Sequence, residues 1–483
     1  MIQSSNKLII KKYRIMKTIL TSIITFIFFA NSYAQDISGN WAGQVQLGSD
    51  KKLEFIFYIT KDGGNYTTVI DIPTNRVTGL KPKATTFTDN NLLVDGSNLG
   101  IKYEGVFDST IQKFKGEFSE GQNKIPLNLE KLKGKLKTTK VNRPQEPNKP
   151  YPYHEEEVRF NNTEANVTLA GTFTKPKTET EHPVVILITG SGPQDRDQTF
   201  AGHKPFLVLA DYLTRQGIAV LRYDDRGTSE STGNFSTATT EDFANDVVAA
   251  VNYLKTRDDV DIDNIGLIGH SEGGIIAPLA TNKAKKDVSF IISLAGTGIS
   301  GAEFSLWQAT SMRGFPVPDE AAFENAIREG ISIASADQDL SAIRAALKTH
   351  YNSTLVPILK PVVGSNEKIA GAIDNLINAN TTPWVRYFYS YNPADEYAKI
   401  KKPVLSLNGS KDTQVPAKIH QEGIKKALEK AKNKKFQIIE LDGLNHLFQE
   451  ADTGKMDEYS KIDQTFSPKA LEIISDWILK QTN

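Results

Sequence analysis

The alternation of two kinds of segment after Glu155 constrains the fold more than any other feature of this sequence. Segments with helical periodicity, such as Phe243, Val247 and Val251 behind a Thr239-x-x-Asp242 capping pattern, separate short apolar runs. Parallel strands must be joined by crossovers that are usually helical, so the pattern predicts a mostly parallel sheet covered on both faces by helices. The apolar runs are Val184–Thr189, Ile218–Arg222, Ile265–Ile268, Val288–Leu294, Val404–Leu407 and Phe436–Leu441.

One interval is too long for an ordinary crossover. Between Gly298 and Tyr397 about 100 residues separate two predicted strands, whereas a crossover needs only about a dozen. Ala321–Ala336 and Ser341–Tyr351 within it have helical composition. We therefore predict an α/β domain over residues 154–483 with a helical cap inserted at about residues 299–397.

The preceding residues, 35–132, have the alternation of β-strands. Leu53, Phe55, Phe57 and Ile59 are spaced two apart and lead into the turn sequence Asp62-Gly63-Gly64-Asn65. This pattern predicts a small all-β barrel or sandwich. Gly39-Asn40-Trp41 is similar to the opening of lipocalin-type barrels, although a Trp that fills one end of a β core is the simpler interpretation. Residues 133–153 are rich in Lys and Pro and predict a semi-rigid linker.

The first 34 residues predict an export signal. Basic residues precede the apolar run Ile19–Ala30, and Ser32-Tyr33-Ala34 offers small residues at a cleavage site. The apolar run is shorter than the about 20 residues of a membrane span. We expect a secreted protein, periplasmic or extracellular, without a stable membrane anchor after cleavage.

Composition excludes several classes of site. The chain of 483 residues contains no Cys, which excludes disulfides, Cys-ligated metals and a cysteine nucleophile. Its 57 basic and 57 acidic residues give no basic excess for binding nucleic acid. The seven His residues lack His-Glu-x-x-His spacing, so we expect neither a metal nor another cofactor. Any nucleophile must therefore be a hydroxyl.

One serine has the sequence context of a nucleophile. Gly269-His270-Ser271-Glu272-Gly273 follows the predicted strand Ile265–Ile268 and precedes the helical run Ile275–Ala277. A Gly-x-Ser-x-Gly pentad in a strand–turn–helix is typical of a nucleophile elbow. We therefore predict Ser271 as the nucleophile.

Position along the chain selects its partners. His446 follows the last predicted strand, where the general base of such a site belongs, and the order Ser…Asp…His is kept. Asp412 follows the strand Val404–Leu407 and is the predicted acid, with Asp395 and Asp442 as rivals. The spacing predicts the triad Ser271, Asp412 and His446.

The remaining parts of the predicted site are an oxyanion hole and a pocket. The backbone amide of Glu272 and one amide from the loop after Val184–Thr189, that of Ser191 or of Gly192, are the expected oxyanion donors. Aromatic residues of the cap are candidates for the substrate pocket, although aromatics at this spacing are also common in cores. They are Trp307, Trp384 and Phe388.

From about Glu155 onward, the chain resembles the α/β-hydrolase superfamily, its serine-aminopeptidase-like (S33) branch, and most of all the extracellular EstD-type esterases. The resemblance implies hydrolysis of carboxylic esters by Ser271, Asp412 and His446 beneath a helical cap. It departs at Thr228-Ser229, where many relatives carry a second glycine. Besides the elbow, the motifs are Gly190-Ser191-Gly192-Pro193-x-x-Arg196, Arg222-Tyr223-Asp224-Asp225-Arg226-Gly227, Asn408-Gly409-x-x-Asp412-x-x-Val415-Pro416 and Gly443-x-Asn445-His446.

Three functions remain open on the sequence. The leading one is a serine esterase acting on small-molecule esters through an acyl-enzyme intermediate. A serine peptidase of aminopeptidase or dipeptidyl-peptidase type is the first alternative, and a non-catalytic binding protein on a hydrolase scaffold is the second. The linker also predicts that a truncated protein beginning near Lys149 folds and stays active on a small ester.

Overall fold

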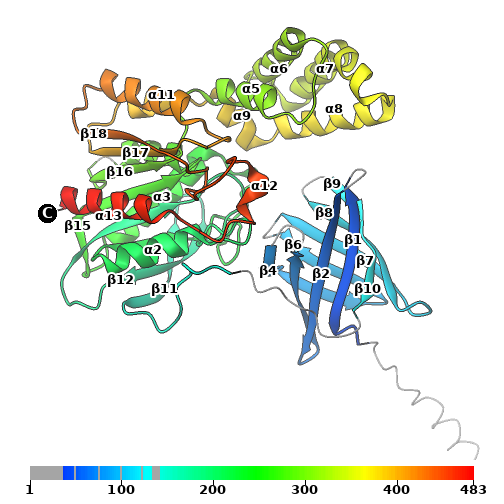
Figure 1. Cartoon of the computed structure of the whole chain (residues 1–483), viewed down its shortest axis with the longest axis horizontal. Helices are drawn as coiled ribbons and strands as arrows, with labels where there is room; N and C mark the ends of the chain where they lie inside the picture. Colours follow the sequence, from blue (N-terminus) through cyan, green and yellow to red (C-terminus); the bar gives the residue numbers. More distant parts are fainter. Residues whose placement is uncertain are drawn as a thin grey trace, which may run out of the picture.

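The computed structural model describes residues 36–47, 51–73, 77–97, 100–120, 123–132, 142–284 and 286–482. The chain forms an N-terminal β-barrel and a C-terminal α/β domain that carries a helical cap (Figure 1). The predicted export signal, residues 1–34, and residues 133–141 of the predicted linker lie outside the described residues. None of the helices in the described part is long and apolar enough to cross a membrane.

The N-terminal domain is an antiparallel ten-stranded sheet that closes on itself, because β10 pairs with both β1 and β8. Alternate side chains point inward, and large aromatics such as Phe57, Tyr103 and Phe114 are fully buried. Trp41 is also buried, and its indole N–H donates to the Ile37 carbonyl at 2.8 Å, as expected of a Trp that fills a β core. The strands are β1 (Gly39–Leu47), β2 (Lys51–Asp62), β3 (Asn65–Ile72), β4 (Val77–Leu80), β5 (Ala84–Thr88), β6 (Asn91–Gly96), β7 (Ile101–Asp108), β8 (Lys113–Glu120), β9 (Asn123–Pro126) and β10 (Leu129–Lys131).

The C-terminal domain is built on an eight-stranded sheet in the order β11-β12-β14-β13-β15-β16-β17-β18. Strands β13 to β18 run parallel to one another, and the antiparallel strands β11 and β12 extend the sheet beyond β14. All six predicted apolar runs are strands of this sheet. The strands are β11 (His154–Asn162), β12 (Val167–Lys175), β13 (His182–Ile188), β14 (Ala219–Tyr223), β15 (Val260–His270), β16 (Phe290–Leu294), β17 (Val404–Gly409) and β18 (Phe436–Leu441).

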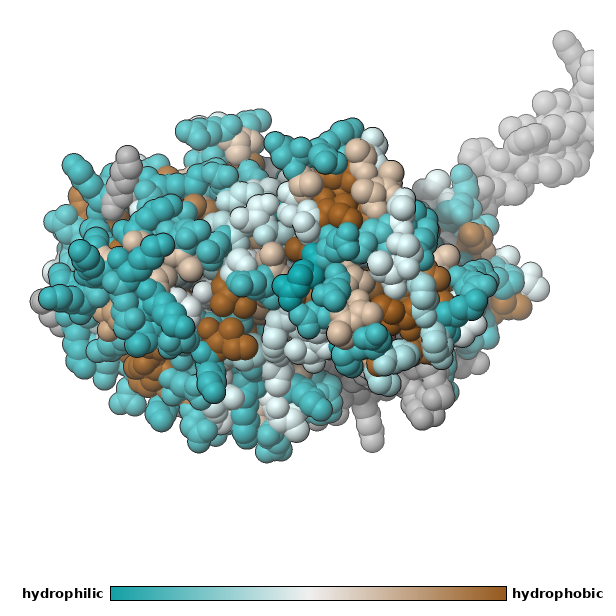
Figure 2. Space-filling model, turned by 90° about the horizontal axis from the view of Figure 1, so that it is seen from above, coloured by the Kyte–Doolittle hydropathy of each residue, from teal (hydrophilic) through white to brown (hydrophobic). Residues whose placement is uncertain are grey.

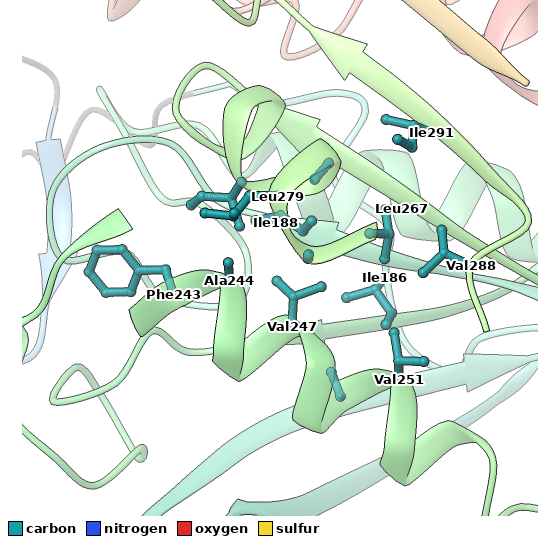
Figure 3. Packing of buried hydrophobic residues seen from close by; sticks show 14 of the residues in the cluster. Ile186, Ile188, Phe243, Ala244, Val247, Val251, Leu267, Leu279, Val288 and Ile291 are labelled. Carbon is teal, nitrogen blue, oxygen red and sulfur yellow. The ribbon is translucent and has the colours of Figure 1, made fainter. Parts of the chain in front are cut away.

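Helices cover both faces of the sheet. On one face, α3 (Thr240–Leu254), α4 (Gly273–Ala284) and α11 (Ala417–Lys430) contribute to a core that includes Ile186, whereas α2 (Pro205–Arg215) and α13 (Pro468–Thr482) pack on the other with Val185. Figure 3 shows Val247 and Val251 of α3 facing Ile186 and Leu267 of the strands. The predicted capping box at Thr239 is present. This is the α/β-hydrolase fold that the sequence predicted.

The long interval after β16 is the predicted helical cap. Its own core contains Ile343, Leu347 and Tyr351. The second predicted cap helix is longer than expected, because α7 continues past Tyr351 to Val363 and ends where Gly364 adopts a positive φ of 72°. Seen from above, the molecule is mostly hydrophilic and its hydrophobic side chains lie in separate patches (Figure 2). The helices are α5 (Gly301–Ser311), α6 (Glu320–Ala334), α7 (Leu340–Val363), α8 (Asn366–Asn380), α9 (Pro383–Ser390) and α10 (Pro393–Tyr397).

Candidate active site

Ser271 lies in a sharp turn between β15 and α4. Its φ is +54°, a left-handed conformation that a serine seldom adopts, and its amide donates to the Leu294 carbonyl at 2.8 Å. The turn leaves no space for side chains around it: a Cβ on Gly269 would lie 1.9 Å from the Gly273 carbonyl oxygen, and one on Gly273 would lie 2.2 Å from that of Ile188. The glycines of the pentad are therefore required by packing, and the turn has the geometry of a nucleophile elbow.

His446 is hydrogen-bonded to Asp412. Its Nδ1 lies 2.7 Å from Oδ2 of Asp412, and the side chains of the two residues are 6% and 0% exposed. The other carboxylate oxygen of Asp412 accepts from the amides of Gln414 and Val415 at 2.9 and 2.8 Å, which fixes its orientation. A carboxylate only accepts, so Nδ1 carries the imidazole proton and Nε2 keeps the lone pair that a general base needs.

The two rival acids lie in other structural roles. Asp442 accepts from the Ser410 hydroxyl at 3.1 Å in the turn after β18. Asp395 belongs to the first turn of α10, where an acidic residue is favoured by the helix dipole. Among the described residues, Asp412 is the carboxylate that is hydrogen-bonded to His446.

A pocket of about 300 Å³ contains the candidate nucleophile and base. Ser271 and His446 both line it, so the structure brings these two predicted residues to one cavity. The cap closes it with α5 and α9. Its other lining residues are Ser191, Glu272, Ile275, Thr297, Phe304, Ser305, Gln308, Trp384, Val385, Phe388, Tyr389, Gln414 and Val415.

The structure does not place all three predicted pocket residues at the pocket. Trp384 and Phe388 line the pocket as expected, but Trp307 does not. Phe304, Ser305 and Gln308 of helix α5 line the cavity, and at about 100° per residue Trp307 lies about 60° from Phe304 and about 100° from Gln308, at the edge of that face. Its ring instead stacks on Phe304, with centroids 6.2 Å apart and planes at 6°.

The two expected oxyanion donors of the early loop differ in their position relative to the pocket. Ser191 lines the cavity with Glu272, whereas Gly192 is not among its lining residues. Within the described residues, the amides of Ser191 and Glu272 donate to no other protein group. Two backbone donors are thus available beside Ser271, as an oxyanion requires.

Besides its backbone amide, Glu272 contributes its side chain to the site. One carboxylate oxygen, Oε1, accepts from the Trp384 indole at 2.6 Å and from the Thr240 hydroxyl at 2.7 Å. Burial raises the pKa of this carboxyl, and no described Lys or Arg is paired with it.

The side chain of His270, next to Ser271 in the turn, is hydrogen-bonded to the loop that carries His446. Its Nε2–H donates to the backbone carbonyl of His446 at 2.8 Å, and its Nδ1 accepts from the Gln198 amide at 2.9 Å. Oε1 of Gln198 accepts in turn from the amide of Gly190 at 3.3 Å. Burial lowers the pKa of His270 to about 3, so the imidazole is neutral. Sequence spacing carries no signal for this network.

No group of three or more His, Asp or Glu side chains in the described ranges is arranged to hold a metal ion. The candidate site consists of the serine, the bonded His–Asp pair, two free amides and a pocket under the cap. This arrangement can perform acyl transfer by nucleophilic catalysis.

The model of the X-Pro dipeptidyl-peptidase (S15) family matches residues 152–436, more than half of the chain. Esterase EstD of Thermotoga maritima is 26% identical over 319 residues, which cover 65% of this chain and 66% of EstD, just under two thirds of that relative. An esterase of Pyrococcus furiosus has a TM-score of 0.41 at 16% identity, covering 71% of this chain and 96% of that one. Dipeptidyl peptidase 4 of Porphyromonas gingivalis has a TM-score of 0.41 at 15% identity, covering 88% and 48%.

The expected superfamily is therefore confirmed, but the serine-aminopeptidase-like (S33) branch is not, because the family that matches is S15. The motifs in the sequence could not separate these branches, since the elbow and its neighbouring loops are demanded by the shared chemistry. The matched range includes Ser271 and Asp412 and ends before His446. Because this match covers most of the α/β domain with its serine elbow, the chain belongs to the X-Pro dipeptidyl-peptidase (S15) family of α/β-fold serine hydrolases.

Proposed function

We propose that this protein is a serine esterase that hydrolyses small carboxylic esters. The observation that carries the proposal is the shared pocket, which is lined by Ser271 at its strained turn and by His446 in its bond to Asp412. Ser271 attacks the ester carbonyl while His446 takes the proton of the serine hydroxyl, and the amides of Glu272 and Ser191 stabilise the oxyanion. His446 then gives this proton to the leaving alcohol as the ester C–O bond breaks. Water then releases the acid from the acyl-enzyme by the same steps.

The shape and lining of the pocket support an ester with a small or medium acyl group. A volume of about 300 Å³ is at the small end for ligand pockets. Ile275, Phe304, Phe388 and Val415 supply apolar walls that suit an acyl chain. The similarity to EstD supports the same substrate class.

A peptidase is the second candidate, and Glu272 is the observation that favours it. Its buried carboxylate lines the pocket next to the nucleophile and has neutral donors as its hydrogen-bond partners. An ammonium group of a substrate could bind there, as the free amino end of a peptide or aminoacyl compound would. The name of the matching family points to the same alternative.

One experiment separates the two candidates. The mature protein is assayed in parallel on p-nitrophenyl esters of increasing acyl length and on aminoacyl and X-Pro p-nitroanilides, with Ser271→Ala as the control for contaminating activity. We expect ester turnover that disappears in Ser271→Ala and persists in Glu272→Gln. Anilide turnover that exceeds ester turnover and is lost in Glu272→Gln would replace the esterase by the peptidase.

We also propose that the enzyme acts outside the cytoplasm, because residues 1–34 have the pattern of an export signal. Cell fractionation with N-terminal sequencing of the recovered protein tests this. We expect the enzyme in the periplasm or medium with Gln35 as its first residue, and a cytoplasmic protein with an intact N-terminus would refute it.

A further inference from the structure

The second half of the predicted linker is bound to the α/β domain. Arg143, whose side chain is 5% exposed, donates through Nε to the Gly202 carbonyl and through Nη1 to the Ile462 carbonyl, both at 2.8 Å. Its Nη2 lies 3.3 Å from the carbonyls of Ala201 and Ser460. One buried guanidinium thus joins two loops that are far apart in the sequence.

Gln145 makes a second set of bonds two residues later. Its Oε1 accepts from the amides of Thr465 and Phe466 at 2.6 and 3.0 Å, and its Nε2 donates to the Phe466 carbonyl at 2.7 Å. The side-chain amide therefore pairs with the backbone of Phe466 as a neighbouring strand would. We call residues 142–146, which carry these contacts, the strap.

The residues held by Gln145 contact the turn that carries His446. The ring of Phe466 stacks on Phe448, with centroids 5.4 Å apart and planes at 4°. The next residue, Ser467, donates its amide to the Phe448 carbonyl at 2.7 Å. Phe448 itself has a φ of +60°, a strained conformation that persists only where the surroundings impose it. The strap thus supports the strained end of the His446 turn.

A second path leads from Arg143 to the acid of the triad. Arg143 holds the Ser460 carbonyl, and the preceding residue, Tyr459, is fully buried. The hydroxyl of Tyr459 accepts from the Gln414 side chain at 2.9 Å, while the Gln414 amide donates to Asp412. Both paths end at the His446–Asp412 pair.

We propose that the strap positions the catalytic histidine, so that the segment between the barrel and the α/β domain is part of the esterase's catalytic apparatus. Arg143 and Gln145 touch no reacting atom and act through Phe466, Phe448 and Tyr459. The inference rests on the proposed function of the Ser271 site. It also moves the boundary of the active domain, because a protein cut near Lys149 would lack both side chains.

The test uses the full chain with Gln145→Leu, which removes all three hydrogen bonds, and Gln145→Glu, which keeps the two accepting ones. Lys149→Ala is the matched control, because this lysine is 68% exposed and its ion pair with Glu155 lies on the surface. Small displacements of a catalytic group cost up to about 100-fold in rate, so we expect kcat on p-nitrophenyl acetate to fall about 10- to 100-fold in Gln145→Leu. KM should change little, Gln145→Glu should fall in between, and Lys149→Ala should match the wild type.

The downfield proton NMR signal of the His446 Nδ1–H bonded to Asp412 gives a readout that needs no substrate. We expect Gln145→Leu to shift or broaden this signal at temperatures well below its melting point. An unchanged signal and kcat, or a lower melting temperature with both unchanged, would overturn the positioning role. If the wild type hydrolyses no ester, the proposed function fails, and the NMR signal still decides the inference.

Discussion

Replacing His270 by Phe tests whether this residue holds the loop of His446 in place. The change keeps a ring of similar size but removes the bonds to the His446 carbonyl and to Gln198, at 2.8 and 2.9 Å. Both partners are buried, at 5% and 3% exposure, so each loses a bond that water cannot replace. An unsatisfied buried group costs about 1–3 kcal/mol, and we therefore expect the free energy of unfolding to fall by about 2–6 kcal/mol near neutral pH.

The pH dependence of this loss provides an independent check. Burial lowers the pKa of His270 to about 3 from its ordinary value near 6.5 in the unfolded chain. Between pH 6.5 and pH 3, His270 is therefore protonated in the unfolded chain but neutral in the folded chain. The free energy of unfolding of the wild type consequently decreases as the pH falls toward 3. The decrease in the free energy of unfolding is about 1.4 kcal/mol per pH unit below 6.5, or about 2 kcal/mol at pH 5. The phenyl ring of the His270→Phe variant binds no such proton. The difference in free energy of unfolding between the wild type and the variant should therefore be smaller at pH 5 by about this amount.

The assay is urea unfolding of both proteins at about pH 7.5 and about pH 5, with kcat on p-nitrophenyl acetate measured in parallel. Gln198→Leu is the matched variant, since it removes the bond to Nδ1 and the longer bond from the half-buried Gly190 amide, and leaves the bond to the His446 carbonyl. We expect it to lose about 1–3 kcal/mol and less activity than His270→Phe. A deficit for His270→Phe below about 1 kcal/mol, or one that is equal at both pH values, would refute the reasoning.

Three further predictions follow from the site. Ser271→Ala and Asp412→Asn should each lower kcat roughly 10³-fold or more at unchanged melting temperature. The first variant lacks the nucleophile, and the second holds the imidazole in the wrong tautomer. Near-normal turnover in either variant would place the site elsewhere. Trp384→Phe keeps an aromatic wall but loses the 2.6 Å bond to Glu272, so KM should rise about 2- to 10-fold, and an unchanged KM would show that this bond does not shape the pocket. EDTA should leave ester turnover unchanged, and activity lost to the chelator and restored by a divalent metal would contradict a metal-free triad.

The sequence by itself determined those features that are encoded locally. Apolar runs of strand length, separated by helical patterns, specified the parallel sheet and the inserted cap, because burial on both faces of a strand leaves a visible pattern in consecutive residues. The elbow is equally local. Gly269 and Gly273 are needed within two residues of Ser271, where any Cβ would meet backbone atoms. The order of strands then sufficed to nominate Asp412 and His446 at one edge of the sheet.

The tertiary structure alone decided contacts between residues that are distant in the sequence. Which side of α5 faces the pocket depends on how the cap is seated, and this placed Phe304 rather than Trp307 against the cavity. The bond from His270 to the His446 carbonyl spans 176 positions, and that from Gln145 to Phe466 spans 321. No periodicity encodes such pairs, because their partners are chosen by the packing of whole elements. The Lys- and Pro-rich composition predicted a linker but could not predict that Arg143 and Gln145 bind it to loops of the α/β domain.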